Sequence, residues 1–215
     1  MFEGYRPETV DFLWGIRMNN NREWFLAHKS EYTRFLYEPT KALAQEVFQP
    51  FLEVPGLELK VSRIYRDARL HHPLPYKESL WFCIRREVDS WSEHPALFFE
   101  INPEGAAYGF TLWRPRPGAM EAFRRELLAR PETFLSVLAR TEADAGLPVT
   151  AERYKREKPC LDPRVAAYYS WKADVSCVVR EPVGPGLFDP DLSRRVRRLL
   201  TALLPWNEYW QGIVG

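Results

Sequence analysis

The chain has 215 residues, of which 46% are apolar and 27% charged, and its formal net charge is +1. With 8 Trp, 10 Tyr and 13 Phe it can bury a core, which excludes an intrinsically disordered chain. The near-neutral charge argues against a dedicated DNA-binding protein, because phosphate contacts need many basic side chains, but it leaves a local basic patch open.

The first third of the chain predicts helices. Pro7 suits a first helical position, and Asn20 followed by Glu23 resembles a capping box. Pro39 is expected to end one helix and to open the next. Apolar residues recur at helical spacing in three segments, around residues 7–16, 24–36 and 43–52.

The hydrophobic period then changes to two. Leu57, Leu59 and Val61 alternate with polar residues, which predicts a half-buried strand. Further strands are predicted at residues 80–85, 96–101, 107–113 and 175–179. The short turn between the second and third of these strands predicts antiparallel pairing, because parallel strands need a long crossover.

Helices return in the second half, around residues 120–128 and 131–140, with a short one near 165–171. Residues 146–163 are predicted to form a long surface loop. A last helix should follow Asp189-Pro190, because an apolar stripe continues at helical spacing to Leu203. We therefore predict the α+β class, as one domain over residues 1–215. An antiparallel sheet of about five strands should pack against N-terminal, middle and C-terminal helices.

Several features indicate a cytoplasmic protein. Cys83, Cys160 and Cys177 are odd in number and have no close pair, which favours reduced thiols over a disulfide framework or a zinc knuckle. The first residues lack the pattern of a signal peptide, and the longest apolar runs are too short to cross a bilayer. No membrane partner is therefore expected.

Known cofactor and catalytic motifs are absent. The sequence has no glycine-rich phosphate loop, no nucleophile elbow and no HExxH pair. The four histidines are scattered, and the adjacent pair His71-His72 is interpreted as part of an exposed loop. We expect no metal and no cofactor, and the sequence assigns no reaction.

One segment concentrates positive charge. Residues 60–86 contain seven basic side chains, Lys60, Arg63, Arg66, Arg69, Lys77, Arg85 and Arg86, against only Asp67 and Glu78. If the extended conformation of residues 57–61 continues, Arg63, Tyr65, Asp67 and Arg69 lie on the face of Leu57, Leu59 and Val61 and turn inward. Charges that turn inward must be paired or must reach a polar cavity.

Two interpretations of this cluster stay open. In the functional one, Arg63, Arg66, Arg69 and Lys77 hold an anion such as a phosphate or carboxylate, Asp67 orients them, and Tyr76 supplies a wall or a hydroxyl. In the structural one, Asp67 joins the arginines in a salt-bridge network that holds strands together.

The same residues resemble a known family. Arg63, Arg66, Asp67 and Arg69, followed by Pro75-Tyr76-Lys77, are similar to the hallmark of the bacterial and fungal family catalogued as domain of unknown function 2461. The opening Phe2-Glu3-Gly4 and the run from Asn20 to Phe25 also resemble family landmarks. Leu70 stands where the family usually has Phe. The resemblance implies a family of bacterial proteins over nearly the whole chain but no activity.

Three functions therefore remain. The first is a small-molecule-binding protein or enzyme that acts on an anionic ligand. The second is a protein- or RNA-binding module that uses the basic and aromatic surface. The third is a motif that only supports the fold. A second basic group, Lys155, Arg156 and Lys158, is interpreted as a solvated loop, with a phosphate-binding role as the alternative.

Overall fold

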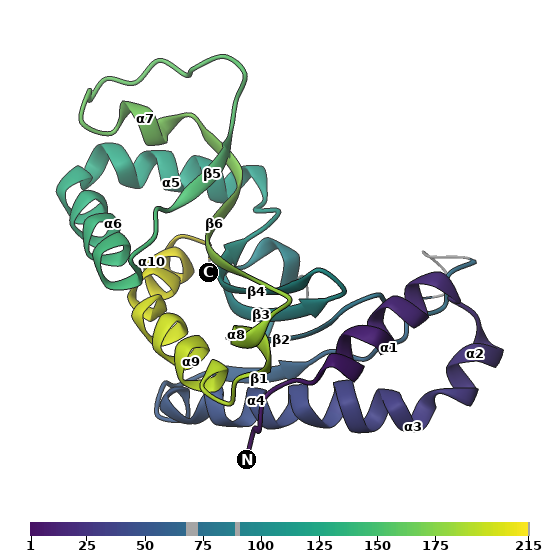
Figure 1. The fold of residues 1–215 in the computed structure, drawn as a ribbon. Helices are drawn as coiled ribbons and strands as arrows, with labels where there is room; N and C mark the ends of the chain where they lie inside the picture. Colours follow the sequence, from purple (N-terminus) through teal and green to yellow (C-terminus); the bar gives the residue numbers. More distant parts are fainter. Residues whose placement is uncertain (68–72, 89–90, 215) are drawn as a thin grey trace. The chain divides into compact units, whose positions relative to one another are not determined.

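A computed structural model describes residues 1–67, 73–88 and 91–214 (Figure 1). The chain divides into two compact units, each assembled from three separate segments. Unit 1 comprises Met1–Ile84, Phe98–Tyr108 and Arg180–Arg198. Unit 2 comprises Arg85–Leu97, Gly109–Val179 and Leu199–Gly215. The expectation of a single domain over residues 1–215 stays a prediction.

The strands form one antiparallel sheet in the order β1-β2-β3-β4-β6-β5. Their bounds are β1 Leu57–Val61, β2 Leu80–Arg86, β3 Ala96–Asn102, β4 Gly105–Leu112, β5 Thr150–Arg153 and β6 Trp171–Pro182. The α+β class and the antiparallel sheet are confirmed, with one strand more than the predicted five. The additional strand is β5, which lies in the segment predicted as a loop and pairs with β6 through two register shifts.

Strand β5 escaped prediction for a physical reason. Its residues are exposed except for the half-buried Ala151, so its sequence carries no apolar alternation. It is held by backbone pairing to β6, which no side-chain pattern records. Strand β6 is longer than predicted. It begins at Trp171, one residue after the short helix α7 (Ala166–Tyr169) ends.

The N-terminal helices belong to unit 1. They are α1 Pro7–Met18, α2 Arg22–Ala27, α3 Lys29–Glu31, the π-helical segment η1 Tyr32–Tyr37, α4 Glu38–Phe48 and the short 3-10 helix η2 Gln49–Phe51. Pro7 opens α1 as predicted, and α1 packs against η1 (Figure 1). The π-helical segment lies directly before Pro39, whose missing N–H interrupts regular α-helical hydrogen bonding.

The remaining helices are α5 Pro117–Ala129, α6 Pro131–Ala145, α8 Pro185–Phe188, α9 Leu192–Ala202 and α10 Leu204–Val214, with the 3-10 helix η3 at Trp91–Glu93. The predicted apolar stripe of α9 is buried throughout. Helix α10 packs against α5 and α6 in unit 2, where its Trp206 and Trp210 are fully buried. In the part of the chain that the structure describes, no helix is both long and apolar enough to span a bilayer.

We expect Gly109→Ala to lower the free energy of unfolding by about 2 kcal/mol or more, because a disfavoured backbone conformation alone costs about 1–3 kcal/mol. Gly109 in β4 has a φ of +153°, and an added Cβ would lie 2.0 Å from the carbonyl oxygen of Cys177 in β6. Urea denaturation measures the change. Gly118→Ala is the control, since a Cβ on this residue of α5 meets nothing within 4 Å. Equal stability of the two variants would contradict a close β4–β6 approach.

Candidate functional site

The two halves of the Arg-rich motif lie side by side in unit 1. Arg66 N donates to Pro75 O at 2.9 Å, and Lys77 N donates to Ile64 O at 2.7 Å. These bonds frame an antiparallel bridge between Tyr65 and Tyr76. Residues 63–67 and 75–77 therefore form one local ribbon, although they are separate in the sequence.

Where β1 ends, the buried side chains move from the odd-numbered residues to the even-numbered ones. Ser62 and Ile64 are 4% and 1% exposed, whereas Arg63, Tyr65 and Asp67 are exposed. The prediction that Arg63 and Asp67 continue the inward face of Leu57 is therefore wrong. Ser62 binds Trp81 through both its backbone N–H and its hydroxyl oxygen, and this contact turns Ser62 inward. A shift of one residue exchanges the two faces of a strand.

Arg66 is the partly buried cation of the motif. Its Nη2 lies 3.5 Å from Glu78 Oε1, while the other oxygen of Glu78 accepts from Arg17 Nε at 2.8 Å. Arg17, on α1, also pairs with Glu104 in the turn between β3 and β4. The Nε of Arg66 is buried, and no residue described by the structure accepts a hydrogen bond from it. Glu78 is thus shared between two arginines, and Arg66 has the weaker contact.

Lys77 lies beside Arg66 in a partly desolvated position. Its Nζ donates to Arg63 O at 2.5 Å and lies 5.6 Å from the ring centroid of Trp81. Burial lowers the pKa of Lys77 below its ordinary value, and the positive charge of Arg66 lowers it further, while Glu100 acts in the opposite direction. Arg66 is therefore a like charge that acts on Lys77.

Tyr76 is a buried anchor. Its ring stacks on Phe25 with a centroid separation of 4.3 Å and lies 5.5 Å from the ring of Tyr65. Burial raises the pKa of Tyr76, and so to a lesser extent does Tyr65, while Arg22 lowers it. The hydroxyl therefore stays protonated at neutral pH. The exposed ring of Tyr65 extends this aromatic surface to solvent.

The side chain of Asn20 fixes Tyr76 through two hydrogen bonds to the Tyr76 backbone. Its Nδ2 donates to Tyr76 O at 2.9 Å, and its Oδ1 accepts from Tyr76 N at 3.0 Å. The prediction that Asn20 caps the following helix is wrong, because the cap of α2 is Asn21, whose Oδ1 accepts from Trp24 N. Sequence reasoning also missed Arg17. Nothing in the local pattern of α1 marks it, since its partners are distant in the sequence.

The structure describes most of the predicted site residues. Arg63, Arg66, Tyr76 and Lys77 lie together on the ribbon, and Asp67 is exposed at its end. Arg69 and the pair His71-His72 lie outside the described residues.

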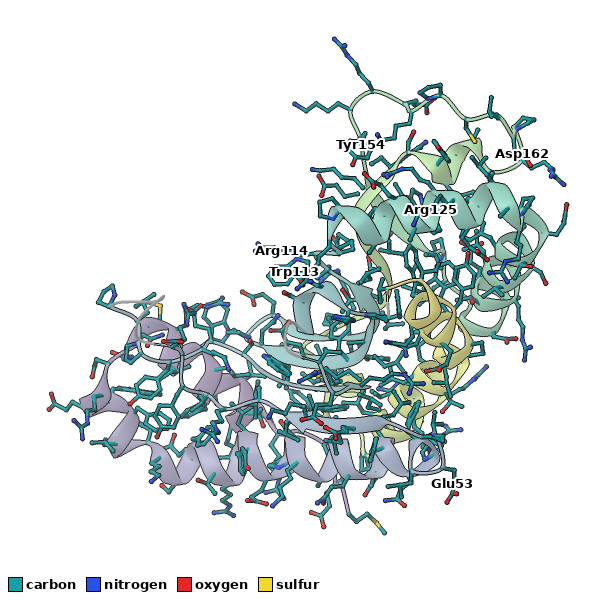
Figure 2. All side chains as sticks on the ribbon, turned by 180° about the vertical axis from the view of Figure 1, so that it is seen from behind. Glu53, Trp113, Arg114, Arg125, Tyr154 and Asp162 are labelled. Carbon is teal, nitrogen blue, oxygen red and sulfur yellow. The ribbon has the colours of Figure 1, made fainter. Side chains whose placement is uncertain are left out.

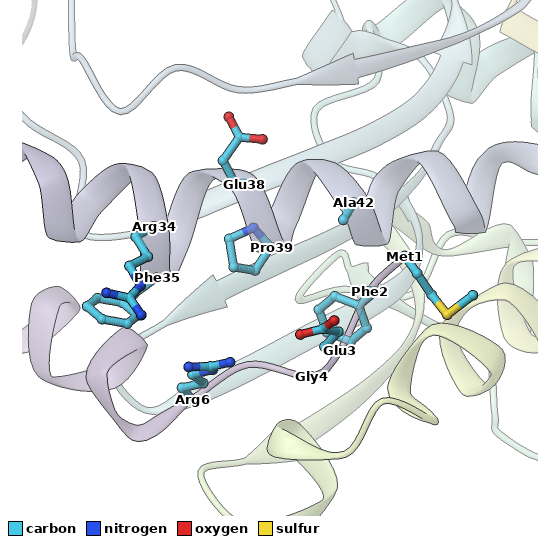
Figure 3. Close-up of a pocket in the computed structure, with 10 residues that line it drawn as sticks. All are labelled: Met1, Phe2, Glu3, Gly4, Arg6, Arg34, Phe35, Glu38, Pro39 and Ala42. Carbon is cyan, nitrogen blue, oxygen red and sulfur yellow. The ribbon is translucent and has the colours of Figure 1, made fainter.

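A cavity of about 310 Å³ lies elsewhere in unit 1, between the N-terminal segment and the helical stretch of η1 and α4 (Figure 3). Its charged lining residues are balanced, since Arg6 and Arg34 stand against Glu3 and Glu38. None of the described motif residues lines it. Its neutral charge gives no reason to assign it an ionic ligand.

Two observations concern metal ligands and the Cys177 thiol. Over residues 1–67, 73–88 and 91–214, no group of three His, Cys, Asp or Glu side chains could hold a metal ion. Burial, and secondarily Glu142, raises the pKa of Cys177 to about 11. A thiol with such a pKa stays protonated at neutral pH and is a poor nucleophile.

We expect Asn20→Ala to lower the free energy of unfolding by about 2 kcal/mol, because two hydrogen bonds to a buried residue are lost at about 1 kcal/mol each. Chemical denaturation checks this value. Asn19→Ala is the matched control, since the Asn19 side chain is exposed and donates locally to Gly15 O at the end of α1. A loss no larger than that of Asn19→Ala would show that Asn20 does not hold the ribbon.

One comparison with known proteins identifies a family. A profile of the family described as conserved hypothetical protein (DUF2461) matches residues 8–209. A search of the curated proteins finds no match. The match extends over nearly all of the 215 residues and over both units. The family inferred from the Arg-rich motif is thereby confirmed, and the chain belongs to the DUF2461 family.

Proposed function

We propose that the protein binds a small molecule carrying a phosphate or carboxylate group, as a binding protein or as an enzyme acting on that molecule. Arg63, Arg66, Arg69 and Lys77 supply the positive charge, with Asp67 as the residue that orients them. The role of Arg69 rests on the sequence alone. A cytoplasmic location also stays a prediction.

The observation that carries the proposal is the incomplete pairing of Arg66. Among the described residues, the carboxylate that pairs with it, Glu78, is 3.5 Å away and is already bound by Arg17, and its buried Nε has no acceptor. Buried polar atoms are normally satisfied. An anion that binds from solution can complete the coordination, since a guanidinium matches the oxygens of phosphate and carboxylate.

The charge around Arg66 favours the same class of ligand. Arg63 and Lys77 add two positive charges on the same ribbon, and Glu78 is shared with Arg17. The pKa of Lys77 is lowered first by burial and then by Arg66, so the ammonium is less stable here than in water. A bound anion would stabilise it. The exposed ring of Tyr65 offers a wall for the rest of the ligand.

The alternative of a structural network also has a specific observation in its favour. Arg66, Glu78, Arg17 and Glu104 form a continuous series of ion pairs that joins α1, the motif and the β3–β4 turn. In that case the motif would stabilise unit 1 without a ligand. The two functions predict different results for the same variant. A structural network predicts that loss of Arg66 lowers stability without any anion, whereas a binding site predicts that it mainly removes the effect of the anion.

We expect phosphate or a small carboxylate to raise the melting temperature of the protein, and Arg66→Met to abolish the shift while the variant stays folded. A ligand at a hundred times its dissociation constant adds about 2.7 kcal/mol of stability, which a thermal-shift screen detects. Arg180→Ala is the control, because it removes an exposed arginine of unit 1 outside the motif.

Two results would contradict binding at this site. If no anion shifts the wild type and Arg66→Met melts much earlier, the motif is structural. If only short RNA binds, with an affinity that falls steeply with salt, the surface is a nucleic-acid site instead.

We expect the contribution of Lys77 to stability to rise with pH. Between its lowered pKa in the folded protein and the ordinary value of 10.5, the unfolded chain binds more protons than the folded one. The free energy of unfolding therefore increases with pH in this window. The difference between wild type and Lys77→Met, measured by urea denaturation across this range, should show the slope. Saturating phosphate should flatten it, because a bound anion favours the protonated amine. A slope of the opposite sign would contradict the lowered pKa of Lys77.

A further inference from the structure

A second cavity lies entirely within unit 2, away from the residues of the motif. Its volume is about 460 Å³, which is within the usual range of about 300–1,000 Å³ for small-molecule pockets. Helix α5 supplies one wall, and the segments around Lys158 and Tyr169 supply the other. The lining residues are Glu121, Arg124, Arg125, Leu128, Lys158, Pro159 and Tyr169.

Arg124 is a buried cation in the wall of this cavity, with only 8% of its surface exposed. Its Nε donates to Tyr169 O at 3.1 Å and its Nη2 to Trp171 O at 3.0 Å. Both partners are neutral carbonyl groups. Within the part of the chain that the structure describes, no carboxylate lies within ion-pair distance of Arg124. A buried charge without a counter-charge is costly, so an anion that reaches Arg124 would be strongly favoured.

Two further cations line the cavity. Arg125 and Lys158 are exposed, and neither has an ion-pair partner among the described residues. Lys158 Nζ lies 4.7 Å from the ring centroid of Tyr154, and Arg124 Cζ lies 5.4 Å from the same centroid. Both cations therefore contact the electron-rich ring of Tyr154, which positions them in the wall of the cavity. Figure 2 shows Arg125 on α5 and Tyr154 in the segment after β5.

The lining also has an apolar part. Leu128, Pro159 and Tyr169 complete the cavity, and Glu121 is its one carboxylate. Three cations against one anion leave an excess of two positive charges, which matches a phosphate dianion better than a single carboxylate. The volume exceeds what a phosphate group alone would fill, so the apolar side chains can contact an organic substituent.

We propose that this cavity binds a small phosphate monoester. Arg124 forms the rigid base of the site because its side chain is held by two carbonyls. Arg125 and Lys158 bind the phosphate from the open side, and the apolar residues contact the ester group. This site is separate from the one proposed at Arg66, and each can exist without the other.

The test is isothermal titration calorimetry of the full chain with phenyl phosphate, and with acetate at matched ionic strength. Lys158→Ala and Arg125→Ala should each weaken phenyl phosphate binding about tenfold, as expected for the loss of one charge-assisted contact. Lys155→Ala is the matched control, because it removes the same charge from the same exposed segment without lining the cavity. Acetate should bind more weakly than phenyl phosphate.

The variant Arg66→Met separates the two proposed sites. Binding that survives Arg66→Met and is weakened by Lys158→Ala belongs to the cavity in unit 2. Binding that is unchanged in Lys158→Ala and Arg125→Ala overturns this inference, whatever the effect of Arg66→Met. Equal weakening by Lys155→Ala, or no binding of phenyl phosphate at millimolar concentration, overturns it as well.

Discussion

The candidate site depends on the backbone pairing between residues 63–66 and 75–77. Two backbone hydrogen bonds, one on each side of the Tyr65–Tyr76 bridge, align these segments. Asn20 then fixes the ribbon to the start of α2 by binding both the N–H and the carbonyl of Tyr76. Because neighbouring residues of a strand point to opposite faces, this pairing decides which motif residues meet solvent and which turn inward. The aromatic contact between Tyr76 and Phe25 supports the same arrangement from the helical side.

Arginine is used in two different ways in this protein. Several arginines are paired with nearby carboxylates, as Arg164 is with Asp162 and Arg194 with Asp191. Arg66 and Arg124 differ. Among the residues that the structure describes, Arg66 shares one carboxylate at 3.5 Å with Arg17, and Arg124 is held by carbonyls and an aromatic ring. A partly desolvated cation attracts an anion more strongly than an exposed ion pair stabilises the fold. For this reason we propose an anionic ligand at both sites.

Much of the fold could be predicted because it follows from local side-chain pattern. The apolar stripe of α9, the start of α1 at Pro7 and the β3–β4 hairpin all agree with the structure. The errors lie where distant contacts override that pattern. Strand β5 is held by pairing to β6 without an apolar alternation of its own, and the phase of the motif changes because Ser62 binds Trp81. Asn20 was expected to act on its own helix, but it binds a residue 56 positions away.

The sequence by itself determined the α+β class, the family and the concentration of basic residues around Arg66, because these are properties of composition, period and motif. Only the tertiary structure decided which of those cations is incompletely paired. It alone showed that Arg17 competes for Glu78 and that Arg124 is buried in the wall of a cavity, with no counter-charge among the described residues. The reason is physical. The electrostatic state of a side chain depends on its distance to groups from other elements and on its burial, and the order of residues along the chain specifies neither.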